Sequence, residues 1–174
     1  SDPGAVGAKG TKEKDITLKI TQKVEELLKK KGAKVTMTRV KDVDVYGVNA
    51  TDAQELQARV DVAENSAADL FISLHINASV NKNVGGFSSY YYPKTSHDAR
   101  VATAIQKRMT NSFGLDDLGI RQANFYVNKR SSMPSALIEM AFITNAKEEK
   151  LLNSNWFQSK LAKAIADGID DYFK

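Results

Sequence analysis

The segment Asp69-Leu-Phe-Ile-Ser-Leu-His-Ile-Asn-Ala-Ser79 decides the fold class of this chain. Its nearly unbroken apolar run is typical of a strand that is buried on both faces of a sheet. The run ends at His75, one of only two histidines in the chain. In open α/β sheets, ligands bind beyond the carboxyl ends of the strands. His75 is therefore placed for a ligand or catalytic role, although an imidazole at a strand end can also serve only as a hydrogen-bonding group.

Helical and strand-like patterns alternate along the rest of the chain. Amphipathic helices are predicted from Lys14 to a glycine cap at Gly32, from a capping box at Thr51 to Ala67, from a second capping box at Thr95 to Gly114, and through Phe157–Ile169. Strands are predicted at 35–38, 69–75, 87–92, 125–127 and 136–138, and residues 115–123 are expected to form a loop. This alternation predicts an α/β domain with helices on both faces of one sheet.

Size and composition exclude several classes of protein. A chain of 174 residues is expected to form one domain, and the absence of cysteine rules out disulfides and thiolate chemistry. No apolar run is long enough to cross a bilayer. The 25 Lys and Arg exceed the 21 Asp and Glu by four, which favours anionic partners such as nucleic acid, acidic membranes or wall polymers, although a small lysine surplus on an ordinary solvated surface is the stronger alternative. Because no basic run is interleaved with aromatic residues, nucleic-acid binding is not expected.

Two glutamates stand out as candidates for chemistry. Glu139 lies within the apolar stretch Pro134–Ile143, where desolvation would raise its pKa and suit it for proton transfer. The alternative is a glutamate that faces water or pairs with a lysine. Glu13 precedes a helix, where a negative charge simply complements the helix dipole. One histidine and two glutamates are parts that a zinc hydrolase uses, although a third protein ligand would still be required.

The motifs of the chain resemble, in the same order, those of the zinc-dependent N-acetylmuramoyl-L-alanine amidases of the amidase_3 type, which are bacterial cell-wall hydrolases. The resemblance covers essentially the whole chain. The matching segments are Asp2–Ala5, Glu13–Asp15, Thr38–Arg39, Arg59, Ala63–Asn65, Asp69–Ala78, Gly119–Arg121 and Pro134–Asn145.

The resemblance implies a single three-layer αβα domain, with a mixed and mostly parallel sheet flanked by helices on both faces. It implies a Zn²⁺ ion held by His, Glu and His, in which Glu13 and His75 match two of the three ligands. Glu139 matches the catalytic glutamate. Asn77 and Arg121 match motifs near the substrate groove.

Two features depart from the family pattern. Members open with a buried strand that leads into Asp-x-Gly-His-Gly-Gly, whose histidine is the first zinc ligand, whereas this chain starts at Ser1-Asp-Pro-Gly4. We therefore expect residues 1–174 to be an amidase catalytic domain that lacks its first strand and first zinc-ligand motif. The stretch between Arg39 and Arg59 is longer than expected and looks like an inserted loop that could line the groove.

The expected activity is hydrolysis of the amide bond between N-acetylmuramic acid and L-alanine of the peptidoglycan stem peptide. The expected protein is an extracytoplasmic, secreted autolysin that is monomeric and fused to cell-wall-binding modules. A metal-free wall-binding or regulatory domain with the same fold is the main alternative, and a zinc peptidase would share the same metal site.

Overall fold

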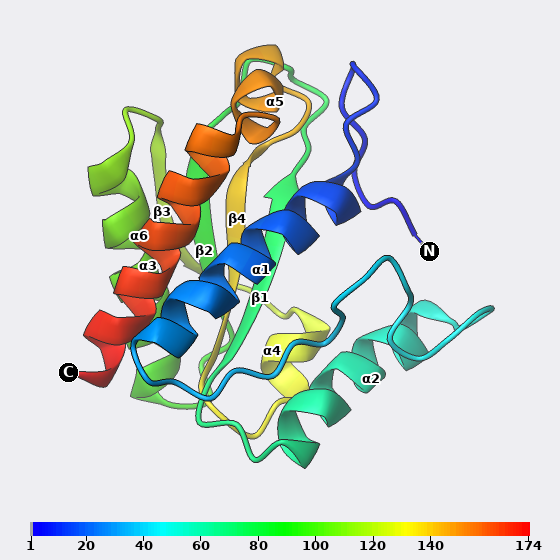
Figure 1. Cartoon of the computed structure of the whole chain (residues 1–174), viewed down its shortest axis with the longest axis vertical. Coiled ribbons are helices and arrows are strands. Elements are labelled where there is room, and N and C mark those ends of the chain that lie inside the picture. The colour runs from blue at the N-terminus through cyan, green and yellow to red at the C-terminus, as the bar shows by residue number, and fades with distance from the viewer. Residues whose placement is uncertain (1) are drawn as a thin grey trace.

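The computed structural model describes residues 2–174, which form one α/β domain around a four-stranded sheet (Figure 1). The helices are α1 (Glu13–Lys30), α2 (Asp52–Asn65), α3 (Ser96–Ser112), α4 (Tyr126–Arg130), α5 (Ala146–Leu152) and α6 (Asn155–Phe173). The strands are β1 (Phe71–Asn77), β2 (Phe87–Tyr91), β3 (Asp117–Gln122) and β4 (Ser135–Phe142).

The sheet is mixed and mostly parallel, as predicted. Its strand order is β1-β4-β2-β3. The outer pairs β1–β4 and β2–β3 are parallel, while the central pair β2–β4 is antiparallel. The carboxyl ends of β1 and β4 therefore lie at the same edge of the sheet, next to the amino end of β2.

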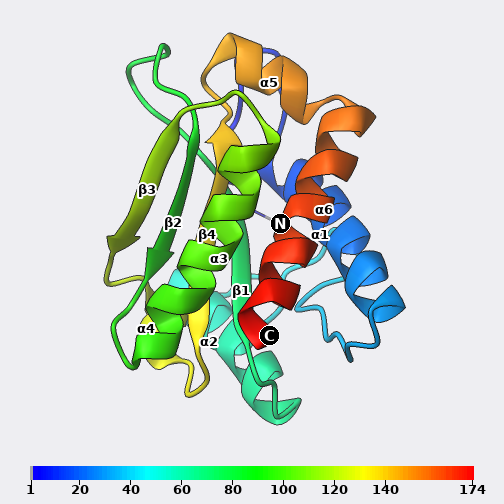
Figure 2. The ribbon, with the colours of Figure 1, turned by 90° about the vertical axis from the view of Figure 1, so that its left-hand side faces the viewer.

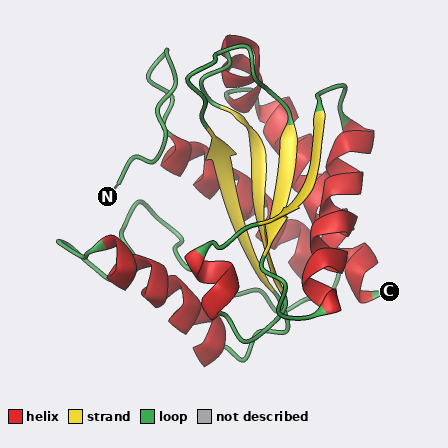
Figure 3. Ribbon diagram, turned by 180° about the vertical axis from the view of Figure 1, so that it is seen from behind, coloured by secondary structure: helices red, strands yellow, loops and turns green. Residues whose placement is uncertain are grey.

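Alternation along the strands divides the side chains between two faces of the sheet. On one face, Ile138 and Met140 of β4 belong to the large core cluster that α1, α3 and α6 complete. Figure 2 shows these three helices together on one side of the strands. On the other face, a smaller cluster joins Phe71 of β1 to residues of α2 and α4. Helices thus cover both faces, although much of the second face has no helix over it (Figure 3).

The predicted helix boundaries are confirmed closely. The side chains of Thr51 and Thr95 form the capping boxes of α2 and α3, with Gln54 and Asp98 as their partners. The helix α1 ends just before Gly32, whose positive φ of 89° is the conformation that glycine adopts most readily. No helix in residues 2–174 is both long enough and apolar enough to cross a membrane.

Three local predictions are wrong. The stretch expected as a loop contains the edge strand β3. Most of its residues are exposed, so its sequence lacks the pattern of a buried strand, and the strand forms because it pairs with β2. The apolar run 125–127 leads into the one-turn helix α4, because Val127 packs against α2 rather than joining the sheet. Residues 35–38 form no strand, since no other strand in the described residues pairs with them; Val35 packs on the main core instead.

Candidate active site

The predicted site residues on β1 and β4 lie side by side on the less covered face of the sheet. His75 and Glu139 are register partners in the parallel β1–β4 pair. Across the antiparallel pair, Ser88 of β2 is the register partner of Glu139. Register partners project to the same face, so these three side chains form one row, with Glu139 in the middle. The row is close to the carboxyl ends of β1 and β4.

Glu13, far from this row in sequence, reaches it from the first turn of α1. Its Oε1 atom lies 3.0 Å from Nδ1 of His75 and accepts a hydrogen bond from the backbone N–H of Ile76 at 3.2 Å. Its Oε2 atom accepts a hydrogen bond from the backbone N–H of Ala5 at 2.9 Å. Gly4 makes this arrangement possible, because a Cβ atom there would lie 2.5 Å from Oε2 of Glu13. The turn before α1 therefore fixes the carboxylate against β1.

The two glutamates have pKa values shifted in opposite directions. Burial alone would raise the pKa of Glu13, but the hydrogen bonds from His75, Ala5 and Ile76, together with the His75 charge, lower it below its ordinary value. Burial raises the pKa of Glu139 to about 7, with a smaller raising effect from the Glu13 charge and an opposing effect from His75. Its Oε2 atom is buried without a hydrogen-bond partner. Glu13 is thus a carboxylate near neutral pH, and Glu139 is poised to exchange a proton.

The pair of Glu13 and His75 fits two positions of a zinc site. Two donors of a tetrahedral zinc ion with bonds of about 2.0–2.1 Å lie about 3.3 Å apart, close to the 3.0 Å found here. The other ring nitrogen of His75, Nε2, lies 3.0 Å from the hydroxyl of Ser73. If Nε2 donates its hydrogen to Ser73, Nδ1 is free to bind a metal, which is the usual way in which a second partner orients a histidine ligand. Within residues 2–174, no cluster of three or more His, Cys, Asp or Glu side chains forms a metal site.

The two remaining predicted residues lie farther out. Arg121 of β3 is the register partner of Tyr90, which in turn pairs with Leu137, so Arg121 projects from the same face as Glu139. It is separated from β4 by two strand spacings, about 10 Å. Asn77 ends β1 beyond His75, and its side-chain oxygen accepts a hydrogen bond from the backbone N–H of Ala78. Both residues lie near the row of His75, Glu139 and Ser88, and within residues 2–174 neither side chain hydrogen-bonds to it.

Two serines that line the site were not predicted. Ser73 contacts His75 from two residues earlier on the same strand, and Ser88 adjoins Glu139 on β2. Period-two alternation could have placed Ser73 on the face of His75, since both lie in one predicted strand. Nothing in the sequence could have placed Ser88, because its position depends on the pairing of β2 with β4.

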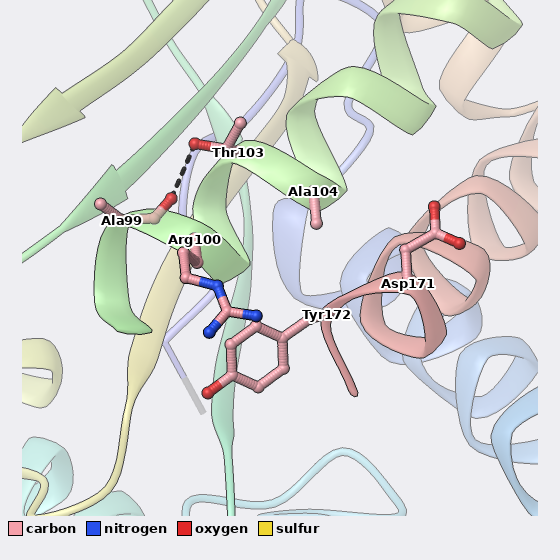
Figure 4. Close-up of a pocket in the computed structure, with 6 residues that line it drawn as sticks. All are labelled: Ala99, Arg100, Thr103, Ala104, Asp171 and Tyr172. Carbon is pink, nitrogen blue, oxygen red and sulfur yellow. Dashed lines mark hydrogen bonds between the residues drawn. The ribbon is translucent and has the colours of Figure 1, made fainter. Parts of the chain in front are cut away.

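A hollow between α3 and α6 is separate from this site. It is lined by Ala99, Arg100, Thr103, Ala104, Asp171 and Tyr172. Figure 4 shows the Arg100 guanidinium against the Tyr172 ring. The hydroxyl of Thr103 donates a hydrogen bond to the carbonyl oxygen of Ala99. Both helices cover the opposite face of the sheet from Glu139. The hollow therefore takes no part in the chemistry of the row.

Comparison with known proteins gives concordant matches over nearly the whole chain. A family model described as N-acetylmuramoyl-L-alanine amidase matches residues 1–171. The chain is 36% identical over 175 residues to the N-acetylmuramoyl-L-alanine amidase LytC of Bacillus subtilis (strain 168), covering 99% of this chain and 33% of LytC. It is 35% identical over 178 residues to the germination-specific N-acetylmuramoyl-L-alanine amidase of the same organism, covering 99% of this chain and 75% of that protein.

A solved structure of an amidase catalytic domain has the same fold as this chain. The catalytic domain of CwlV, an N-acetylmuramoyl-L-alanine amidase from Bacillus (Paenibacillus) polymyxa var. colistinus, superimposes with a TM-score of 0.87 at 37% identity. The match covers 99% of this chain and 91% of that domain. The chain thus spans only a third of LytC but nearly all of a catalytic domain.

Proposed function

Because the chain belongs to the N-acetylmuramoyl-L-alanine amidase family, we propose that it is the catalytic part of a zinc-dependent peptidoglycan hydrolase. The scissile bond is the amide between N-acetylmuramic acid and L-alanine of the stem peptide. The observation that carries the proposal is the convergence of Glu13, His75 and Glu139 at one edge of the sheet, from three segments of the chain that are far apart in sequence.

In this proposal, Glu13 and His75 are two of the protein ligands of the zinc ion. The donor set of one carboxylate and one imidazole suits zinc, and the low pKa of Glu13 keeps its carboxylate ionised for binding. When bound, the ion would polarise the carbonyl of the scissile amide and lower the pKa of a water molecule. Ser73 holds the ring of His75 in the orientation that turns Nδ1 towards Glu13.

Glu139 is the proposed general base and general acid. Its carboxyl group is largely buried, has one oxygen without a hydrogen-bond partner and has a pKa of about 7. A carboxyl group of this kind can accept a proton from the attacking water and then release it to the nitrogen of the departing amine. Because its pKa lies near neutrality, neither transfer is strongly unfavourable at physiological pH.

Arg121 and Asn77 are the proposed substrate-binding residues. Arg121 stands on the same face of the sheet as Glu139, two strands away, where its guanidinium can meet a group of the substrate that extends across β2. Asn77 lies two residues beyond His75, at the carboxyl end of β1. The substrate would then lie over the row of His75, Glu139 and Ser88, held by Asn77 at the carboxyl end of β1 and by Arg121 on β3.

The location of the substrate sets the proposed place of action. Peptidoglycan lies outside the cytoplasmic membrane, so an enzyme that cleaves it acts as an extracytoplasmic, secreted autolysin. We expect the catalytic part to be monomeric, and we expect wall-binding modules to be fused to it. The net charge of +4 is compatible with anionic wall polymers as neighbours.

The test is analysis of the products that the purified natural protein releases from peptidoglycan, together with its zinc content. An amidase frees the amino group of stem-peptide L-alanine and the lactyl carboxyl group of N-acetylmuramic acid. A peptidase would release other amino ends, and a wall-binding domain would bind to the walls without releasing products and would purify without stoichiometric zinc. Either of the last two results would overturn the proposal.

A further inference from the structure

Two register partners in the site each have a buried polar side-chain atom without a hydrogen-bond partner. In residues 2–174, four buried side-chain atoms have no partner: Ser88 Oγ, Asn128 Oδ1, Glu139 Oε2 and Glu149 Oε2. Ser88 and Glu139 are the only two of these whose residues are register partners on neighbouring strands. Ser88 is only 1% exposed, so bulk solvent does not reach its hydroxyl group.

An unpartnered hydroxyl at this position is costly, and the strand does not require it. A buried polar group without a partner costs about 1–3 kcal/mol. The next residue, Ser89, is equally buried but donates a hydrogen bond of 2.7 Å to Oε1 of Gln106 on the opposite face. The same strand therefore satisfies one serine and leaves its neighbour unsatisfied. Such exceptions are expected where function, rather than folding, determines the residue.

The placement of Ser88 allows its hydroxyl to reach Glu139. Residues directly opposite each other in an antiparallel pair have Cβ atoms about 4.5–5.5 Å apart. At this spacing, a serine hydroxyl that turns about its one side-chain torsion can approach the carboxylate of its register partner. On its other side, Glu139 has His75 as its register partner. Glu139 thus lies between a candidate metal ligand and a serine whose hydroxyl has no hydrogen-bond partner in residues 2–174.

We propose that Ser88 is a positioning residue for Glu139, whose Oε2 atom its hydroxyl binds during turnover. This inference rests on the proposed function, in which Glu139 gains and loses a proton. A hydroxyl group is both a donor and an acceptor, so it can serve Glu139 in either protonation state. As a donor it holds the carboxylate in the orientation that takes the proton from water. As an acceptor it holds the carboxylic acid until the proton passes to the amine.

The test compares Ser88→Ala and Ser88→Thr with the matched control Ser89→Ala, using the full-length protein and soluble peptidoglycan fragments. We expect Ser88→Ala to lower kcat about ten- to hundredfold, the effect of losing one hydrogen bond to a charged group, while KM stays within about twofold. Its zinc content should be unchanged, and its Tm should be equal to or above that of the wild type, because an unpartnered buried hydroxyl has been removed. Ser88→Thr keeps the hydroxyl and should recover most of the loss.

The control should show the opposite pattern. Ser89→Ala leaves Gln106 without its hydroxyl partner, so its Tm should fall while kcat, measured well below that Tm, stays within about twofold. A Ser88→Ala variant with kcat within about twofold of an active wild type, or a Ser88→Thr variant no better than Ser88→Ala, would overturn the role of Ser88 alone. A wild-type protein without amidase activity would overturn the proposed function and this inference with it.

Discussion

At the scale of single residues, the proposed chemistry depends on one glutamate that exchanges a proton and one that stays ionised. Glu13 has four favourable contacts or charges that hold its pKa down, whereas Glu139 has a buried oxygen with no hydrogen bond and a pKa of about 7. The same side chain therefore serves two purposes in one site, and the local environment decides which. The roles can be separated by substitution, because a ligand and a proton carrier fail in different ways.

Glu139→Gln should slow turnover strongly without removing the metal. The amide has nearly the size of the carboxyl group but cannot exchange a proton, so kcat should fall by about 10²- to 10⁴-fold. Hydrolysis of purified walls and zinc content per protein molecule are the two measurements. Glu13→Ala and His75→Ala are the matched comparisons, and in both the zinc content should fall together with the activity. A Glu139→Gln variant with near-normal hydrolysis would exclude Glu139 from the mechanism.

At the scale of elements, helix α5 holds the loops that bring the site together. The buried carboxylate of Glu148 accepts hydrogen bonds from the backbone N–H groups of Gly86, just before β2, and Phe142, at the end of β4. Its neighbour Glu149 accepts one from the backbone N–H of Lys9, in the turn that precedes Glu13. Two adjacent acids of one short helix therefore fix the amino end of β2, the carboxyl end of β4 and the approach to α1.

Gly7→Ala should loosen this anchor. A Cβ atom at Gly7 would collide with the carboxylate of Glu149 and lie 3.0 Å from the carbonyl oxygen of Ile143. Either Glu149 or the turn must move, and the turn carries the N–H of Ala5 that binds Glu13. We expect the zinc affinity to fall about tenfold, as for the loss of an outer-shell contact to a ligand. Titration with a competing chelator measures it.

The control for this substitution is Gly114→Ala. A Cβ atom at Gly114 has no neighbouring atom within 4 Å, so this variant should bind zinc with unchanged affinity. Wild-type zinc affinity in Gly7→Ala would show that the turn accommodates the methyl group without moving Glu13.

Gly168→Ala tests how closely α6 packs on α3. A Cβ atom at Gly168 would lie 2.6 Å from the Cα atom of Ile105 and 3.0 Å from the carbonyl oxygen of Ala104, and backbone atoms cannot move aside cheaply. Alanine gains about 1 kcal/mol of helix propensity, but overpacking costs about 1–3 kcal/mol, so we expect a net loss of stability. Denaturant unfolding should show a lower midpoint with an unchanged slope. A midpoint at or above that of the wild type would contradict this account of the helix contact.

At the scale of the whole molecule, the sequence predicts those elements whose formation depends on a local pattern of residues. The helices α1, α2, α3 and α6 follow from apolar stripes and caps, and β1 and β4 follow from apolar runs. The edge strand β3 exists because β2 pairs with it, and α4 because Val127 packs on α2, so neither has a sequence pattern of its own.

The candidate site divides in the same way. His75 and Glu139 could be singled out because each is a polar residue in an apolar strand, and the structure makes them register partners. Glu13 could not be identified from spacing, because its approach to His75 depends on how the turn before α1 meets β1; only the family resemblance indicated it. Ser88 escaped notice altogether, because a serine in a strand has no chemical signature until the partner strand is known.

The pH dependence of global stability provides the last prediction, for protein in which a chelator has removed the metal. Glu139 has a pKa of about 7 in the folded state and an ordinary value of 4.5, so between these values the folded state binds more protons than the unfolded state. The contribution of Glu139 to stability is therefore fully present below about pH 4.5 and is lost as the pH rises through about 7. The free energy of unfolding should fall by on the order of 3 kcal/mol across this window relative to Glu139→Gln, which cannot ionise.

Denaturant unfolding of both proteins between pH 5 and about pH 8 measures the difference. The control Glu26→Gln, at an exposed position on α1, should keep the wild-type dependence of unfolding free energy on pH. Parallel curves for the wild type and Glu139→Gln would show that the folded chain does not hold a proton on this carboxyl group near neutral pH.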